Sequence, residues 1–153
     1  MRKRILWIQT GGTFSCAGTK SGLAPQSSEE QAERILALMP QVCEKYDIVT
    51  ITLMNIDSSD MTISDQKRIA DTIGDNIGKY DGIVITHGTD TMAYTAAALS
   101  VMTENPPVPV VLTGSQRPFS GCGRKRCSAM RLRCFRRKNY GRKRLHQDRY
   151  RIG

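Results

Sequence analysis

The sequence lacks any stretch of about 20 consecutive apolar residues, which is the length that a helix needs to cross a bilayer. The basic start, Met1–Arg4, resembles the first part of a secretory signal. The apolar run Ile5–Ile8 that follows is too short for the hydrophobic part of such a signal. Five cysteines, an odd number, without a secretory signal favour free thiols in a reducing compartment. We therefore expect a soluble, cytoplasmic protein.

Sequence signatures of two common kinds of ligand site are also missing. The pair Gly11-Gly12 follows the first apolar run, but no Gly-Lys-Ser or Gly-Lys-Thr comes after it, so this is not a phosphate-binding loop. Glycines just beyond a strand indicate a tight turn or a close approach of the backbone to another group. The polar loops of the chain hold no Cys and His at metal-ligand spacing, so we expect no metal site.

Acidic residues are almost absent from the end of the chain. Residues 121–153 carry thirteen Lys and Arg and one acidic residue, a formal charge of 13 − 1 = +12. Residues 1–120 carry ten basic and thirteen acidic residues, a charge of 10 − 13 = −3, and the two parts add up to the net charge of +9. We therefore divide the chain into an amino-terminal domain, 1–120, and a basic tail, 121–153.

Within the amino-terminal domain, apolar and β-branched runs alternate with helical patterns. The runs predict four strands, at Ile5–Ile8, Ile48–Met54, Gly82–Thr86 and Val108–Leu112. The intervening patterns predict three helices: one capped by Ser27 or Ser28 and ending at Pro40, one capped by Ser64, and one from about 91 to 103. Residues 15–28, rich in Ser, Gly, Thr and Lys, are expected to be a mobile loop. The order indicates an α/β fold with a parallel sheet and helices on both of its faces.

All four predicted strands end in glycine-rich or hydroxyl-rich segments. Any one of these has a simple explanation: Asp90 or Thr91 can cap the helix that follows, and Asp57–Asp60 can serve turns and caps. Four such segments at the carboxyl ends of parallel strands instead favour a ligand site at that edge of the sheet. The abundance of Thr and Ser suggests a hydroxyl nucleophile, which needs a partner base.

The four segments together resemble the bacterial-type L-asparaginases; they are Thr10–Thr13, Asp57–Thr62, Thr86–Met92 and Thr113–Pro118. Within that family, Ser58–Thr62 and Ala93–Ala96 are similar to the cytoplasmic type I branch. The resemblance covers about residues 4–119. It implies hydrolysis of L-asparagine to L-aspartate and ammonia without a metal or organic cofactor. It also implies a second, smaller carboxy-terminal domain and assembly as homodimers or homotetramers.

The resemblance also assigns roles to three residues in the chemical step. Thr13 would be the primary nucleophile, attacking the carbon of the side-chain amide. Thr89 together with Asp90 would form the second catalytic group. Two features of the family have no counterpart here. No tyrosine occurs in residues 19–25, and no lysine can be assigned to the family's catalytic lysine, which lies beyond the region of resemblance.

Further residues would bind the substrate. Ser58 and Asp90 would hold its α-carboxylate and α-amino groups, with Ser59 beside them. The backbone around Gly88, Thr89 and Ser115 would line the pocket for the amide and its oxyanion. This fits the physical chemistry, because a zwitterionic amino acid needs an anion for its ammonium group, and amide donors stabilise a developing oxyanion. A related amidohydrolase that prefers glutamine remains an alternative, since one methylene changes selectivity only modestly.

The basic tail has three interpretations. It can be an arm that binds nucleic acid through phosphate neutralisation. It can hold zinc through Cys122, Cys127, Cys134 and His146, although their spacing fits no common finger. The interpretation we favour is a reading frame shifted by one nucleotide, because residues 142–153 can be encoded so that the next frame reads as an apolar strand. The tail is then out of frame and disordered, the chain is a truncated and inactive enzyme, and nucleic-acid binding is not expected.

Overall fold

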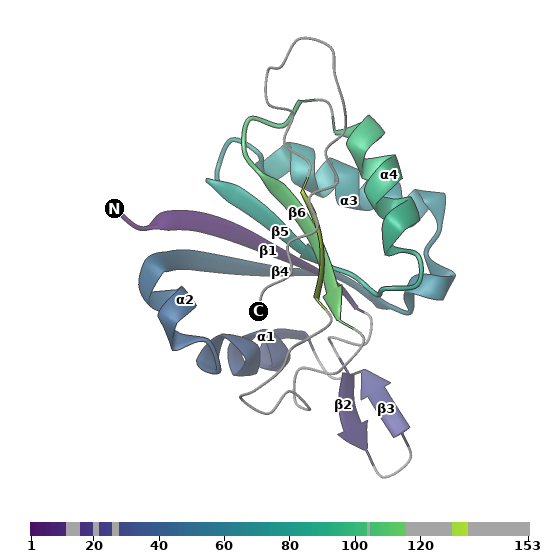
Figure 1. Cartoon of the computed structure of the whole chain (residues 1–153), viewed down its shortest axis with the longest axis horizontal. Helices are drawn as coiled ribbons and strands as arrows, with labels where there is room; N and C mark the ends of the chain where they lie inside the picture. The colour runs from purple at the N-terminus through teal and green to yellow at the C-terminus, as the bar shows by residue number, and fades with distance from the viewer. Residues whose placement is uncertain (12–15, 20–21, 26–27, 104, 116–129, 135–153) are drawn as a thin grey trace.

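The computed structural model of the chain describes residues 1–11, 16–19, 22–25, 28–103, 105–115 and 130–134 (Figure 1). Its main sheet has the strand order β4-β1-β5-β6-β7. These strands are β1 (Lys3–Gly11), β4 (Tyr46–Ile56), β5 (Gly82–Thr86), β6 (Val110–Ser115) and β7 (Met130–Cys134). The first four run parallel to one another, and β7 is antiparallel to β6. The four predicted strands and their parallel arrangement are therefore confirmed.

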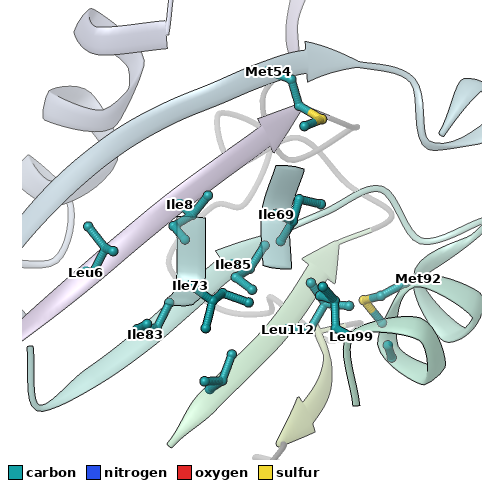
Figure 2. Close-up of a cluster of buried hydrophobic side chains, with 12 residues drawn as sticks. Leu6, Ile8, Met54, Ile69, Ile73, Ile83, Ile85, Met92, Leu99 and Leu112 are labelled. Atoms are coloured by element: carbon teal, nitrogen blue, oxygen red, sulfur yellow. The ribbon is translucent and has the colours of Figure 1, made fainter. Parts of the chain in front are cut away.

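Helices cover both faces of this sheet, as predicted (Figure 1). On one face, α3 (Ile63–Asn76) and α4 (Met92–Met102) contribute to a core with the inner strands. Figure 2 shows Ile69 and Ile73 of α3 and Leu99 of α4 among the side chains of that core. On the other face, α1 (Ser28–Ala37) and α2 (Pro40–Lys45) lie over the strands.

The central parts of the inner strands are apolar because both of their faces are buried. On β1, Leu6 and Ile8 belong to the core shared with α3 and α4, while Trp7 packs with Ala32 and Ile35 of α1. Successive side chains of a strand point to opposite faces, so one strand contributes to both cores. The continuous apolar run in the sequence therefore indicated a strand in the middle of the sheet.

The helix α3 begins differently from the sequence-based prediction. Thr62, not Ser64, is its N-cap: the Thr62 Oγ1 accepts a hydrogen bond from the Asp65 N–H at 3.2 Å. The Asp65 carboxylate accepts one from the Thr62 N–H at 3.1 Å, which completes a capping box. Thr62 has the extended backbone that an N-cap requires, whereas Ser64 already lies within the helix, so the prediction for Ser64 was wrong.

Three other segments differ from the sequence-based prediction. The first helix ends at Ala37 rather than at Pro40, and Pro40 instead opens α2, a position where its missing N–H is not needed. The strand predicted from Val108 begins only at Val110. Part of the expected mobile loop 15–28 is a hairpin of β2 (Cys16–Thr19) and β3 (Gly22–Pro25), so the loop prediction was wrong there.

The strand β7 falls within the predicted basic tail. It pairs with β6 from Ser115 opposite Met130 to Val111 opposite Cys134. The remainder of residues 121–153 lies outside the described residues, so the division of the chain at residue 120 stays a prediction. Within the part that the structure describes, no helix has the length and apolar character needed to cross a membrane.

Candidate active site

The carboxyl ends of the four parallel strands meet at one edge of the sheet, where β1, β5 and β6 are aligned through Gln9, Thr86 and Thr113 (Figure 1). The predicted site residues that the structure describes lie just beyond this row, because each of them follows one of the four strands or is its last residue. Open α/β sheets bind ligands at this edge. Of the predicted site residues, Thr13 lies outside the described residues, and the others are described below.

Gly11 closes β1 by a near contact with β4. Its φ is +101°, a conformation that L side chains rarely adopt, and a Cβ at this position would lie 2.6 Å from the Ile56 N. The register between β1 and β4 shifts between Gln9 and Gly11. Of the two alternatives considered for the glycine pair, a tight turn or a close backbone approach, the structure shows the close approach at Gly11.

After β4 the chain forms a short 3₁₀ turn, Ser58–Asp60, capped by Asp57. The Asp57 carboxylate accepts a hydrogen bond from the Ser59 N–H at 2.9 Å. The cap chemistry expected of Asp57 is therefore confirmed. In this turn Ser58 is buried, with 3% of its surface exposed, whereas Ser59 is exposed to solvent.

Ser58 lies against the turn between β5 and α4. A Cβ built on Gly88 would collide with the Ser58 Oγ and lie 2.6 Å from the Ser58 Cβ. The Thr91 hydroxyl donates a hydrogen bond to the Ser58 carbonyl oxygen at 2.6 Å. Only glycine at position 88 allows the two segments to approach this closely, so the structure brings Ser58, Gly88 and Thr91 into contact.

The same turn carries Thr89 and Asp90. Thr89 is half-buried, and Asp90 is exposed. Among the described residues, Asp90 forms no ion pair. The Asp90 carboxylate thus lies at the solvent side of the edge, next to a hydroxyl residue and three positions beyond a buried histidine.

That histidine, His87, lies within the segment Thr86–Met92, and the sequence analysis gave it no role of its own. Its side chain is fully buried, and its Nδ1 lies 2.7 Å from the Gly88 carbonyl oxygen. A carbonyl oxygen only accepts, so Nδ1 carries the proton of this bond. Burial lowers the pKa of His87 below its ordinary value, and the bond to Gly88 opposes this effect only partly. We conclude that His87 is neutral near pH 7.

The bond to His87 orients the peptide between Gly88 and Thr89. The described residues contain no cis peptide bond, and the C=O and N–H of a trans peptide point in opposite directions. Because the Gly88 carbonyl faces the buried imidazole, the Thr89 N–H points away from it. Among the described residues, none accepts a hydrogen bond from this N–H.

The end of β6 completes the described part of the edge. A Cβ on Gly114 would collide with the His87 carbonyl oxygen and lie 3.4 Å from the Met92 Sδ, so β6 packs closely against the β5–α4 turn. Ser115, the last residue of β6, is buried with 8% of its surface exposed. The His87 N–H donates to the Thr113 carbonyl at 2.9 Å, which continues the pairing of the two strands up to the turn.

Beneath the edge, a row of buried polar side chains crosses the sheet, and the sequence analysis did not predict it. Gln9, Thr86 and Thr113 are each at least 95% buried and stand opposite one another on neighbouring strands. The Thr86 Oγ1 accepts a hydrogen bond from the Trp7 indole N–H at 3.2 Å. In the sequence these three residues lie far apart, each at the carboxyl end of an apolar run. Only the register of the sheet shows that they are neighbours.

Comparison with known proteins shows that most of the chain is similar to the amino-terminal region of asparaginases. The sequence profile of the family described as "Asparaginase, N-terminal" matches residues 4–141, which extends beyond the expected end of the resemblance at about residue 119. L-asparaginase 1 of Escherichia coli K12 is 44% identical over 125 residues, which cover 78% of this chain and 36% of that protein. A Glu-tRNA(Gln) amidotransferase subunit of Methanosphaera stadtmanae is 42% identical over 118 residues, covering 76% of this chain and 26% of that protein.

Solved structures give the same result. The crystal structure of L-asparaginase I from Vibrio cholerae superposes with a TM-score of 0.70 at 42% identity. The match covers 78% of this chain and 36% of the Vibrio chain. The chain therefore spans about a third of the length of these asparaginases. The range matched by the family profile, residues 4–141, includes the edge of the sheet described above.

Proposed function

The chain belongs to the asparaginase family, whose amino-terminal region it matches, and we propose that its sheet edge is the substrate-binding half of a site that hydrolyses L-asparagine. The observation that carries the proposal is the contact between the Ser58 turn and the Gly88–Thr91 turn. It sets a buried serine, a threonine and a solvent-facing carboxylate on adjoining turns, which is the set of groups that a zwitterionic amino acid with a reactive amide requires.

In this proposal each group meets one part of the substrate. The Asp90 carboxylate pairs with the α-ammonium group, and the Ser58 hydroxyl donates to the α-carboxylate. The Thr89 N–H, turned away from His87, stabilises the oxyanion that develops on the side-chain amide. Such donors act in the transition state more than in the ground state, so they accelerate the reaction rather than only tightening binding.

Thr13 is the proposed nucleophile. Its hydroxyl oxygen attacks the amide carbon of asparagine while a base takes up the hydroxyl proton. The amide nitrogen then receives a proton and leaves as ammonia. The resulting aspartyl ester is then hydrolysed by water to L-aspartate and the free threonine. Thr89 with Asp90 is the proposed second catalytic group. The reaction needs no metal or organic cofactor in this scheme.

We further propose that the chain as written does not catalyse this reaction efficiently. It offers no residue in place of the family's catalytic lysine, and a threonine hydroxyl without its base stays protonated. We attribute this to a shifted reading frame after about residue 120. By resemblance to the type I branch, we expect the protein to act in the cytoplasm and its frame-restored form to assemble as homodimers or homotetramers.

Binding of ligands to the 153-residue chain tests the proposal. Calorimetric titration should detect L-asparagine, and Asp90→Asn should weaken this binding about tenfold or more because it removes the charge that faces the ammonium group. Asp75→Asn is the matched control, since Asp75 is an exposed carboxylate on α3. An equal effect of the two substitutions, or the absence of asparagine binding in the unchanged chain, would count against the proposal.

Glutamine is the second candidate substrate, supported by the 42% identity to a protein named as part of a Glu-tRNA(Gln) amidotransferase. Titration with L-glutamine beside L-asparagine separates the two. The competing non-enzymatic function is nucleic-acid binding by the basic tail. Salt-dependent retention of the chain on a nucleic-acid column, abolished by removing residues 121–153, would favour that alternative.

A further inference from the structure

The Thr91 hydroxyl has no role in the proposed chemistry, yet it makes one of the shortest hydrogen bonds at the site. Thr91 occupies the N-cap position of α4, where a threonine side chain usually accepts a hydrogen bond from the first turn of the helix. Here it makes no such bond. Its hydroxyl instead donates to the carbonyl oxygen of Ser58, 33 residues earlier in the chain, at 2.6 Å.

The Ser58 carbonyl thereby serves two partners. It accepts the Met61 N–H at 3.2 Å, a bond within the turn that follows β4, and it accepts the Thr91 hydroxyl from the neighbouring turn. Directly beside this bond, the Cα of Gly88 packs against the Ser58 side chain. One polar and one van der Waals contact thus join the turn that carries Ser58 to the turn that carries Thr89 and Asp90.

We propose that Thr91 is a positioning residue whose hydroxyl fixes the distance between the two substrate-binding turns. Ser58 and Asp90 lie on different turns, and one amino-acid ligand must reach both, so the separation of the turns determines affinity. Thr91 itself faces the Ser58 backbone and does not touch the ligand. This inference rests on the proposed function for its ligand, but the geometric part of it can be tested without any ligand.

The chain contains a closely matched control. At the other end of α4, the Thr103 hydroxyl donates to the Leu99 carbonyl, also at 2.6 Å and also half-buried. This bond closes the last turn of the helix and joins no second segment. Thr91→Val and Thr103→Val therefore remove the same kind of bond from the same helix, and only the first removes a link between the two turns. Thr91→Ser keeps the hydroxyl and serves as the rescue variant.

The first measurement is amide hydrogen exchange in the 153-residue chain without ligand. We normalise the exchange rate of the Met61 amide to that of Ile73, a core position of α3 that reports global opening. Thr91→Val should accelerate the normalised Met61 exchange about three- to tenfold, as expected for the loss of one hydrogen bond. Thr91→Ser and Thr103→Val should leave it unchanged. Equal acceleration in both valine variants, or none in Thr91→Val, overturns the proposal.

The second measurement is the dissociation constant of L-asparagine. Thr91→Val should raise it about three- to tenfold, Thr91→Ser should restore it, and Thr103→Val should not change it. If asparagine does not bind to the unchanged chain, the proposed function fails, while the exchange experiment still decides the role of Thr91. If Thr91→Val does not fold, the unchanged chain decides: a slowly exchanging Thr91 hydroxyl proton in its NMR spectrum supports the bond, and a freely exchanging one overturns it.

Discussion

The Nδ1 of His87 and the carbonyl oxygen of Gly88 lie 2.7 Å apart in the interior, at the point where β5 ends and the candidate site begins. This bond uses the proton on Nδ1. The Nε2 of the same ring is buried and finds no hydrogen-bond partner among the described residues. A neutral imidazole tolerates this environment, whereas a charged one would place an unpaired positive charge in the interior.

The first prediction concerns the stability of the fold in acid. The pKa of His87 is lowered in the folded state, so below its ordinary value of 6.5 the unfolded chain binds a proton that the folded chain does not. The contribution of His87 to the free energy of unfolding should therefore fall as the pH drops below 6.5 and stay constant above it. Urea denaturation near pH 8 and near pH 5 measures the difference.

Two histidine variants provide the control for this prediction. His87→Asn keeps an N–H near the position of Nδ1 but does not titrate, so it should lose part of the acid sensitivity. His146→Asn removes the only other histidine of the chain and should leave the acid sensitivity unchanged. Identical acid sensitivity in the unchanged chain and in His87→Asn would contradict the assignment of the buried, neutral state.

The second prediction concerns the approach of Gly88 to Ser58. Gly88→Ala places a methyl group against the Ser58 side chain and should push the two turns apart, with a loss of L-asparagine binding of at least about tenfold. Gly74→Ala is the opposite case, because a Cβ at Gly74 meets nothing within 4 Å. Within α3 it should stabilise the fold by about 0.5–1 kcal/mol and leave binding unchanged. Denaturation and calorimetry measure both effects, and unchanged binding by Gly88→Ala would refute the close contact.

The third prediction tests which residue caps α3. Thr62→Ala should lower the free energy of unfolding by about 1 kcal/mol, since it removes the oxygen that accepts the Asp65 N–H. Ser64→Ala should change it by less than about 0.5 kcal/mol, because Ser64 is an exposed residue within the helix. A larger loss in Ser64→Ala than in Thr62→Ala would show that the helix begins later than the structure indicates.

The fourth prediction concerns catalysis and the tail. Resequencing around codon 120 should reveal a one-nucleotide shift, and the frame-restored protein should release ammonia from L-asparagine. The 153-residue chain should be slower by about 10²–10⁴, the usual effect of losing general-base help. In the frame-restored protein, Thr13→Ala and Thr89→Ala should each nearly abolish turnover while circular dichroism stays unchanged. Activity of the 153-residue chain within about tenfold of the restored protein would refute our interpretation of the tail.

Much of the fold follows from local sequence patterns. The run Gly82–Thr86 was predicted with the boundaries that β5 has, because a β-branched run of this length between polar turns is too short for a helix. The isoleucines Ile69 and Ile73 of α3 lie one helical turn apart and are fully buried, as apolar residues at this spacing on a helix should be. These properties depend on residues within one element, so the sequence alone determines them.

The arrangement of the site was decided by contacts between distant segments. Thr91 stands where a helix cap is expected, and no local rule could show that its hydroxyl would bond to Ser58 instead. Nor could spacing alone reveal that Gly88 is needed to admit the Ser58 side chain. No feature of the sequence indicated the role of His87, whose protonation state follows from its burial and its bond to Gly88. The sequence determined which residues follow the strands, whereas only tertiary packing decided which of them touch, because register and close approach arise when the strands are assembled.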